Sequence, residues 1–276
     1  MMRRRVLACA LACLFWGAAA ASTQADPPLV ITVGDSIVRD YPDYPCCISV
    51  PIQGWGKEIR RYFGPGLTWR NDAVGGASTG SFIAEGRWSS TLAAHPQYIM
   101  IMFGVNDEQD PNYYADPNTT YRQNLHQMVS DARSIGAVPI LVTPPPVRTS
   151  PDGTHVSRPN LTTPYADAMT AQGAADAVPV ADLHYWLLDT YDALGIPLAQ
   201  QQYGLDQGGM PDKVHFSPYG ADQAARHIVS QLPELQPALA AFLVQTAAPA
   251  LPPWGMAAFV ALLGGAVVVG TRARVR

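Results

Sequence analysis

Cysteine is scarce in this chain of 276 residues, which contains four. Cys9 and Cys13 belong to an N-terminal apolar run, so only the adjacent Cys46 and Cys47 remain for the folded part. Such a pair can form a strained vicinal disulfide, pair between two chains or stay reduced, and the sequence does not choose between these states. Two adjacent thiols are too few for a disulfide framework or a cysteine-based metal cluster, which excludes both.

Basic residues are also few in the central part of the chain. Eighteen Lys and Arg face 22 Asp and Glu in the whole sequence, but six of the arginines lie in the two terminal segments. The remaining chain therefore carries twelve basic against 22 acidic residues. With this excess of acidic residues, the chain between the terminal segments is poorly suited to bind nucleic acid or an anionic membrane surface. We expect no nucleic-acid partner.

The first 25 residues have the layout of a secretory signal peptide. Arg3, Arg4 and Arg5 precede an apolar stretch from Val6 to Ala21, and small residues continue to Ala25. A basic, then apolar, then small-residue order is typical of a cleaved export signal. We expect cleavage after Ala21 or Ala25, and therefore an exported protein.

The C-terminal segment, residues 254–276, resembles a membrane anchor or sorting signal. An apolar run from Trp254 to Gly270 is followed by three arginines, at positions 272, 274 and 276. The run is near the lower limit of roughly 17 residues for a membrane span, and arginines after it favour a cytoplasmic C-terminus. The stretch "ALPPWG" is similar to the motif of Gram-negative exosortase substrates, which implies a sorting protease as partner; a simple tail anchor predicts the same topology. We expect the protein in the cell envelope of a Gram-negative-type bacterium, in the periplasm or on the outer surface, either anchored or released after processing.

The central residues 26–235 alternate strand and helix signals, and residues 236–253 form a helix end and a Pro- and Ala-rich linker. Strands are expected at Leu29–Val33, Leu67–Val74, Tyr98–Gly104, Val138–Thr143 and Val178–Leu183. Helices are expected at Gly54–Phe63, Ser81–Ala94, Thr119–Ile135 and Pro164–Asp176, with a last one starting at Ser217-Pro218. This alternation predicts an α/β fold, a three-layer α/β/α domain with a five-stranded parallel sheet.

Polar residues follow three of the expected strands. The first strand runs into Gly34-Asp35-Ser36, the second into Gly75-Gly76, and the third into Asn106. Each group by itself is typical of a plain turn. The carboxyl ends of parallel strands meet at one edge of the sheet, so we expect the three groups to lie together.

One further pair completes a set of catalytic roles. Asp212 precedes His215 by three residues, a spacing that lets the carboxylate reach one imidazole nitrogen while the other faces a nucleophile. Ser36 then has a base in His215, and the base has an orienting acid in Asp212. The Gly76 N–H and the Asn106 amide can donate hydrogen bonds to an oxyanion.

The four blocks "GDS", "NDAVGGAS", "FGVND" and "DKVH" resemble the ordered blocks of the SGNH (GDSL) hydrolases. Within that family the sequence is most similar to rhamnogalacturonan acetylesterases, also through "QGWG" and "ADLHYWLLDTYDALG". The resemblance implies Ser36 as nucleophile, His215 as base and Asp212 as its orienting acid. It further implies an oxyanion hole formed by the N–H groups of Ser36 and Gly76 and by the Asn106 side chain. Val105 departs from the pattern, because that subgroup usually has His there, which weakens the transfer of substrate specificity.

Several alternatives stay open. "GASTG" fits the G-x-S-x-G nucleophile elbow of α/β-hydrolases, which would make Ser78 the nucleophile. Asp206 is a rival for Asp212, and His184, just after Asp182, is a rival for His215. Asp35, Trp88 and Val105 are candidate substrate contacts, and Trp55 is a further aromatic that either lines a sugar-binding cleft or belongs to the core. The remaining histidines are expected to be inert: His95, His126, His155 and His227.

The sequence therefore predicts an exported serine esterase that acts through an acyl-enzyme and requires no metal or organic cofactor. An acetylated polysaccharide or oligosaccharide is the expected substrate. A lipase-type hydrolase of longer acyl esters keeps the same triad, and an envelope-anchored binding protein with a vestigial site is the alternative from another class.

Overall fold

The computed structural model describes residues 26–41, 52–147, 156, 160–195, 202–205 and 211–244. Cys46, Cys47, His155 and Asp206 lie outside these residues, as do the expected signal peptide and C-terminal segment. Within the described part of the chain, none of the helices combines the length and the hydropathy needed to cross a bilayer.

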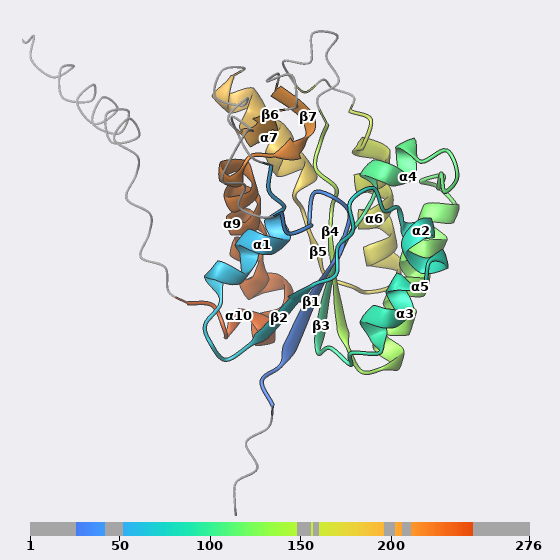
Figure 1. Cartoon of the computed structure of the whole chain (residues 1–276), viewed down its shortest axis with the longest axis vertical. Coiled ribbons are helices and arrows are strands. Elements are labelled where there is room, and N and C mark those ends of the chain that lie inside the picture. The colour runs from blue at the N-terminus through green and yellow to red at the C-terminus, as the bar shows by residue number, and fades with distance from the viewer. Residues whose placement is uncertain are drawn as a thin grey trace, which may run out of the picture.

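A five-stranded parallel sheet forms the centre of the fold, as the sequence predicted (Figure 1). Its strands are β1 (Leu29–Gly34), β2 (Thr68–Asn71), β3 (Tyr98–Met102), β4 (Val138–Val142) and β5 (Val180–Ala181). Their order across the sheet is β2-β1-β3-β4-β5. The chain thus reverses its direction of winding between β1 and β3, and open α/β sheets bind ligands at the carboxyl ends of the strands flanking such a point.

Helices cover both faces of the sheet (Figure 1). The helices α1 (Trp55–Ile59), α7 (His184–Leu194), α9 (Pro218–Leu235) and α10 (Pro237–Ala240) pack on one face. The other face carries α2 (Thr79–Ala84), α3 (Arg87–Leu92), α5 (Thr120–Ser134) and α6 (Thr163–Ala175). Alternate residues of each strand enter the two cores, because successive side chains of a strand point to opposite faces. In β3, for example, Met100 and Met102 join the α1/α9 core, while Ile99 and Ile101 join the α5/α6 core.

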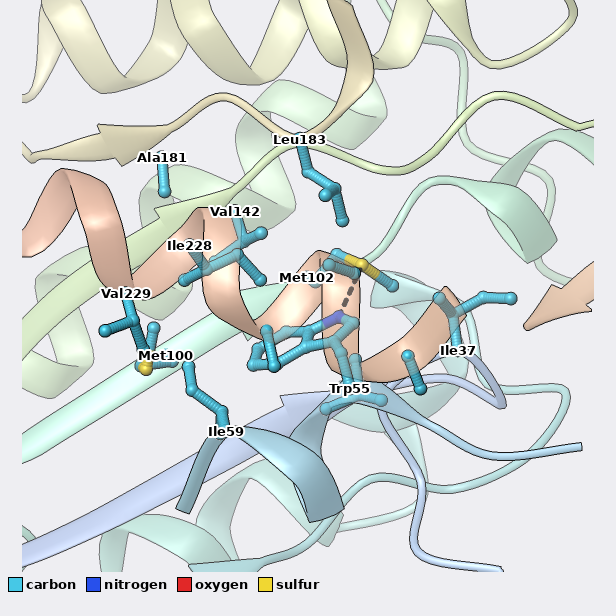
Figure 2. Packing of buried hydrophobic residues seen from close by; sticks show 14 of the residues in the cluster. Ile37, Trp55, Ile59, Met100, Met102, Val142, Ala181, Leu183, Ile228 and Val229 are labelled. Atoms are coloured by element: carbon cyan, nitrogen blue, oxygen red, sulfur yellow. Dashed lines mark hydrogen bonds between the residues drawn. The ribbon is translucent and has the colours of Figure 1, made fainter. Parts of the chain in front are cut away.

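Trp55 anchors the first of these cores. Its side chain is fully buried, and its indole N–H contacts the Met102 sulfur at 3.3 Å (Figure 2). Ile59, one turn later on α1, and Ile228 of α9 pack into the same cluster. This tryptophan is therefore a core residue rather than part of a sugar-binding cleft.

Some boundaries differ from the sequence-based expectation. The helix expected at Ser81–Ala94 is divided into α2 and α3 at Gly86, whose φ of +75° is a left-handed conformation that interrupts a right-handed helix. The fifth strand has two residues, Val180 and Ala181, instead of six. The first helix ends in a 3₁₀ turn, η1 (Arg60–Tyr62).

Two helices and two strands were not expected. The helix α4 (Val105–Gln109) follows β3 directly, and α7 follows β5. An antiparallel pair, β6 (Tyr203–Leu205) and β7 (Pro211–Phe216), precedes α9. Asp212 and His215 therefore lie on a strand, not in a loop. The start of α9 matches the prediction, since Ser217 is its N-cap and its hydroxyl accepts a hydrogen bond from the Gly220 N–H at 3.0 Å.

Candidate active site

Three loops meet at the carboxyl edge of the sheet. The last residues of β1 and β3, Gly34 and Met102, are register partners. Beyond the end of β2, the Val74 N–H still donates to the Gly34 carbonyl at 2.9 Å. The segments that carry Ser36, Gly76 and Asn106 therefore start from neighbouring points, as expected for strands β1, β2 and β3.

Gly34 permits the tight turn that presents Ser36. A Cβ at this position would lie 2.4 Å from Val38 Cγ2 and 2.5 Å from the Met102 carbonyl oxygen, so no larger residue fits without displacing backbone. After Gly34 the chain turns back, and the Asp35 carbonyl accepts the N–H groups of Val38 and Arg39 at 3.2 and 3.1 Å. Ser36 lies on this turn, partly exposed, just beyond the end of β1.

Ser36, His215 and Asp212 form a continuous hydrogen-bonded chain. His215 Nε2 lies 3.0 Å from Ser36 Oγ, and His215 Nδ1 lies 3.0 Å from Asp212 Oδ2. An ionised carboxylate only accepts hydrogen bonds, so Nδ1 must carry the proton and Nε2 is free to accept one from Ser36. The structure thus brings together, over a separation of 179 residues, the three side chains singled out from the sequence.

The carboxylate of Asp212 is held in its charged form. Burial alone would raise its pKa, but hydrogen bonds from the side chain and backbone of His215, together with that from Val214 N–H, outweigh burial and lower the pKa. Both backbone N–H groups donate to Oδ1 at 2.7 Å. The acid is therefore ionised at neutral pH, as a partner of a histidine base must be.

Gly76 and Asn106, the expected oxyanion donors, lie on the segments that follow β2 and β3. Gly76 is exposed and has a φ of +79°, a conformation that favours glycine. Asn106 lies in the first turn of α4, and its Nδ2 donates one hydrogen bond to the Ala77 carbonyl at 3.1 Å. That bond ties the two loops together, and an amide group has a second N–H that can serve a ligand.

Two buried carboxyl groups lie beneath this edge. Asp35 is fully buried, its Oδ1 accepts the Ile37 N–H at 2.8 Å, and its Oδ2 has no hydrogen-bond partner among the described residues. Desolvation raises the pKa of Asp35 to about 7, and the nearby charge of Asp107 adds to the rise. Asp107 is also fully buried, accepts hydrogen bonds from the N–H and hydroxyl of Thr79, and has a pKa raised by desolvation to about 6.

The three expected substrate contacts are all buried, which corrects that expectation. Asp35, Trp88 and Val105 expose 0, 3 and 2% of their surface. Asp35 bonds to its own turn, the Trp88 indole N–H donates to Asp131 at 3.1 Å, and Val105 packs in the α1/α9 core. Apolar or internally bonded side chains that lack solvent contact cannot meet a substrate in this conformation.

The rival nucleophile Ser78 is a helix cap. It is fully buried at the N-cap of α2, where its hydroxyl accepts the Ser81 N–H at 3.2 Å and its own N–H donates to Ser81 Oγ at 2.9 Å. Such a reciprocal pair is a capping box, which satisfies helix N–H groups that otherwise lack partners. The G-x-S-x-G pattern therefore marks a helix start in this chain.

The rival His184 and the other described histidines are not part of the hydrogen-bonded chain that starts at Ser36. His184 is fully buried, with Nδ1 2.9 Å from the Pro144 carbonyl and Nε2 2.9 Å from Thr163 Oγ1. His227 stacks on Trp186 with ring centroids 4.1 Å apart. His126 pairs with Asp176 at 2.8 Å on the surface, and His95 is exposed.

A cavity of about 610 Å³ opens beside β2, α2 and α3. Val74, two residues before Gly76, lines it together with residues of β2, α2 and α3. Two arginines face it, each in an ion pair: Arg70 with Asp72 at 2.6 Å and Arg87 with Glu85 at 2.7 Å. This size is within the range of small-molecule binding sites.

Known proteins are similar to this chain in sequence. The model of the GDSL-like Lipase/Acylhydrolase family matches residues 32–223. Rhamnogalacturonan acetylesterase RhgT of Bacillus subtilis is 32% identical over 220 residues, which cover 76% of this chain and 91% of that protein. A probable rhamnogalacturonan acetylesterase of the same organism, YesY, is 29% identical over 210 residues, covering 75% and 93% of the two chains.

Solved structures show the same architecture. The protein YXIM of B. subtilis superimposes with a TM-score of 0.63 at 25% identity, covering 77% of this chain and 58% of its own. Axe2, an acetylxylan esterase from Geobacillus stearothermophilus, has a TM-score of 0.55 at 18% identity, covering 74% and 94%. The second likeness is one of fold alone.

Proposed function

Since this chain belongs to the GDSL-like lipase/acylhydrolase family and is a serine ester hydrolase, we propose that it removes acetyl groups from a carbohydrate through an acyl-enzyme on Ser36. The observation that carries the proposal is the hydrogen-bonded chain from Ser36 through His215 to Asp212, with both links at 3.0 Å. Acyl transfer needs a nucleophile, a base next to it and an acid that orients the base.

The proposed reaction follows from the arrangement of these groups. Neutral His215 accepts the Ser36 proton at Nε2 as Oγ attacks the ester carbonyl carbon. The carbonyl oxygen becomes an oxyanion and meets the N–H groups of Ser36 and Gly76 and the amide of Asn106, donors that each typically contribute about 10²–10³ in rate. His215 then protonates the departing sugar oxygen, and a water molecule repeats the cycle to release acetate.

The acetylated carbohydrate is proposed from the relatives and from the cavity. Two curated relatives with rhamnogalacturonan acetylesterase in their names align with three quarters or more of this chain. The cavity beside Val74 is large enough, at about 610 Å³, for part of an oligosaccharide. We place the sugar residues that flank the reacting ester there.

The test is hydrolysis of p-nitrophenyl acetate by the purified wild type, Ser36→Ala and Ser78→Ala. Ser36→Ala should be inactive while Ser78→Ala retains its turnover. Loss of activity in Ser78→Ala alone, with both variants folded, would move the nucleophile and refute the assignment. Comparing acetyl with octanoyl esters then separates a deacetylase from a hydrolase of longer acyl chains, and acetate release from an acetylated pectic polysaccharide tests the substrate directly.

We also propose that the protein acts outside the cytoplasm. The proposal is supported by the order of basic, apolar and small residues at positions 1–25 and by the apolar run and arginines at positions 254–276. Fractionation of cells expressing the full chain should find it in the envelope or the medium, without residues 1–25. A cytoplasmic protein with its original N-terminus would contradict this.

A further inference from the structure

Arg39, which the sequence did not single out, is an exposed arginine three residues after the nucleophile. Every other arginine in the described ranges donates to a carboxylate, an amide oxygen or a backbone carbonyl. The guanidinium of Arg39 makes no hydrogen bond or ion pair within those ranges, and its carbon lies over the ring of Tyr41, 5.4 Å from the centroid. Arg39 therefore keeps its hydrogen-bond donors and its charge available for a ligand.

The guanidinium borders the oxyanion loop on the side of the nucleophile. A Cβ on Gly75 would lie 3.1 Å from Arg39 Nη1 and 3.9 Å from Ser36 Cβ, so both atoms lie within 4 Å of one point. A Cβ on the exposed Gly76 would meet no atom within 4 Å, so the space beside this loop is open. A group attached next to an ester bound at Ser36 can therefore reach Arg39.

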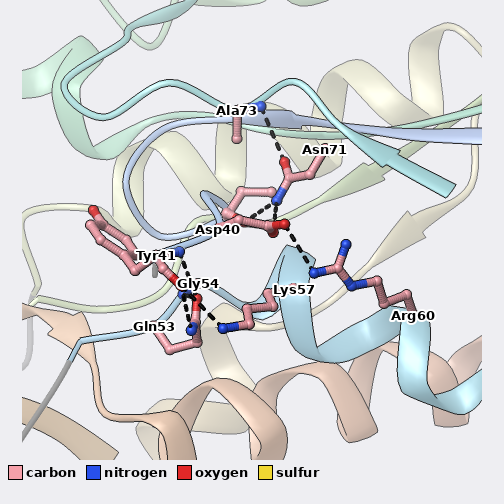
Figure 3. Close-up of polar contacts among 9 residues, drawn as sticks. Asp40, Tyr41, Gln53, Gly54, Lys57, Arg60, Asn71 and Ala73 are labelled. Atoms are coloured by element: carbon pink, nitrogen blue, oxygen red, sulfur yellow. Dashed lines mark hydrogen bonds and ion pairs between the residues drawn. The ribbon is translucent and has the colours of Figure 1, made fainter. Parts of the chain in front are cut away.

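The residues on both sides of Arg39 are fixed by a polar network (Figure 3). Asn71 Nδ2 donates to the Val38 carbonyl at 2.8 Å and to Asp40 Oδ1 at 2.7 Å. Arg60 donates to the other carboxylate oxygen, Asp40 Oδ2, at 3.0 Å. The acid adjacent to Arg39 in the chain is thus bound by two other side chains and does not neutralise Arg39.

Tyr41 supports the guanidinium from a fixed position (Figure 3). Gln53, which is buried, accepts the Tyr41 N–H at 3.0 Å through Oε1 and donates to the Tyr41 carbonyl at 3.2 Å through Nε2. Lys57 Nζ adds a second donor to the same carbonyl at 3.1 Å. A guanidinium that lies over an aromatic ring is attracted to the ring face and keeps its N–H edges free for a ligand.

The charge that Arg39 lacks must come from the ligand. The acids near the nucleophile are already engaged, since Asp212 holds His215 and the buried Asp35 accepts the Ile37 N–H. The planar guanidinium matches the two oxygens of a carboxylate better than it matches a single hydroxyl group. An anionic carbohydrate therefore fits this position better than a neutral one.

We propose that Arg39 determines substrate specificity, because its guanidinium binds the carboxylate of a uronic acid residue next to the acetylated sugar. The inference rests on the proposed function and deepens it, since it names an acidic polysaccharide as the class of substrate. Arg70 and Arg87, which line the cavity beside β2, each have an acid partner already. The free positive charge near the reacting ester is that of Arg39.

Inhibition of p-nitrophenyl acetate hydrolysis tests this role. The probes are an unacetylated oligogalacturonate and the same oligosaccharide with its carboxyl groups reduced to alcohols. For the wild type we expect a Ki about tenfold lower for the acidic probe, because reduction removes hydrogen bonds between charged groups. Added salt should weaken inhibition by the acidic probe alone.

Three variants locate this preference. In Arg39→Gln the two Ki values should agree within twofold, because the charge is gone. Arg39→Lys should keep part of the preference, since it retains the charge and loses the planar fork. Arg61→Gln is the matched control and should keep the full preference, because it removes an exposed arginine that already has an acid partner, Glu58.

The outcomes separate this inference from the proposed function. A wild type inhibited equally by both probes, or an Arg39→Gln variant that keeps the wild-type preference, would overturn the role of Arg39 and leave the proposed deacetylation intact. Acetate release from an acetylated oligogalacturonate is measured in parallel. No release by a wild type that shows the preference would refute the proposed deacetylation and uphold the carboxylate site at Arg39. Thermal melting verifies that each variant is folded, and the comparison of the two probes on the wild type needs no variant.

Discussion

Asp212 and His215 are joined twice within one strand. Asp212 Oδ1 accepts the His215 backbone N–H at 2.7 Å, while Oδ2 lies 3.0 Å from His215 Nδ1. The backbone bond fixes the carboxylate, and the second bond fixes the tautomer of the ring. The acid is thus placed by the same short segment that carries the base.

Replacing that acid should cost most of the activity. In Asp212→Asn the amide keeps the size of the side chain but loses the charge that holds the proton on Nδ1, and kcat should fall about 10³–10⁴-fold. The measurement is steady-state hydrolysis of p-nitrophenyl acetate. Asp176→Asn is the control, because it disrupts a surface Asp–His pair of similar length, 2.8 Å, that is remote from Ser36. Equal activity of both variants would remove Asp212 from the mechanism and leave the undescribed Asp206 as its rival.

Asn106→Ala should lower kcat by about 10²–10³-fold with little change in KM, because an oxyanion donor acts on charge that exists only in the transition state. The bond from Asn106 to the Ala77 carbonyl is lost as well, so thermal melting must accompany the kinetics. Asn118→Ala, on an exposed turn before α5, is the control. An increase in KM with unchanged kcat would show instead that Asn106 binds the substrate in its ground state.

Ser78→Ala should affect stability and leave catalysis intact. Removing an N-cap hydroxyl typically costs about 1 kcal/mol of unfolding free energy. Urea unfolding monitored by circular dichroism should show that loss, and kcat for p-nitrophenyl acetate should stay within twofold of the wild type. Unchanged stability would mean that the Ser78–Ser81 capping box contributes nothing to the fold.

Asp35 should make stability depend on pH. Its pKa is raised in the folded protein from 3.8 to about 7. Between these values the folded state binds more protons than the unfolded state, so the contribution of Asp35 to stability is lost as pH rises from about 4 to about 7. Asp35→Asn can keep the bond from the Ile37 N–H and cannot ionise. It should therefore gain stability relative to the wild type across this window, on the order of 4 kcal/mol at most.

Urea unfolding of the wild type and Asp35→Asn at several pH values checks this difference. Asp107 has a pKa raised to about 6, contributes with the same sign and interacts with Asp35, so the comparison is repeated in an Asp107→Asn background. A difference between the two proteins that does not change with pH would refute the shifted titration of Asp35.

Arg87→Ala tests where the carbohydrate binds. Arg87 lines the cavity that Val74 also lines and is ion-paired to Glu85 at 2.7 Å. If sugar residues occupy this cavity, KM for an acetylated polysaccharide should rise several-fold while kinetics with p-nitrophenyl acetate stay unchanged. Arg61→Ala, which removes the exposed partner of Glu58, is the control. Equal effects on both substrates would exclude a role in binding the polymer.

The sheet could be predicted because its strands are short apolar runs bounded by turn residues, and β1, β3 and β4 kept nearly the expected limits. The site residues could be selected because Ser36, Gly76 and Asn106 each follow one of those strands. The strand β7 could not be seen, because the sequence of Asp212 to His215 is largely polar and its partner β6 has three residues. Sequence patterns mark such segments as loops.

The neighbours of the nucleophile were harder to predict. Asp35 and Ser36 are adjacent in the chain, yet one is fully buried and the other faces His215. The contacts that hold the segment after Ser36 were missed because their partners, Gln53 and Asn71, are distant in the sequence. The local pattern of apolar and polar residues does not reveal contacts between residues that are distant in the sequence.

The location of both Asp212 and His215 on β7 divides the triad into two rigid parts. The acid and base belong to a hairpin outside the central sheet, and the serine lies on the turn that follows β1 of that sheet. A rigid displacement of the hairpin would therefore leave the Asp–His pair intact and change one distance within the triad, the 3.0 Å between His215 Nε2 and Ser36 Oγ. The enzyme would then lose activity through the His215–Ser36 contact alone. The Asp212–His215 pair would keep the proton on Nδ1, so activity would return when that contact formed again.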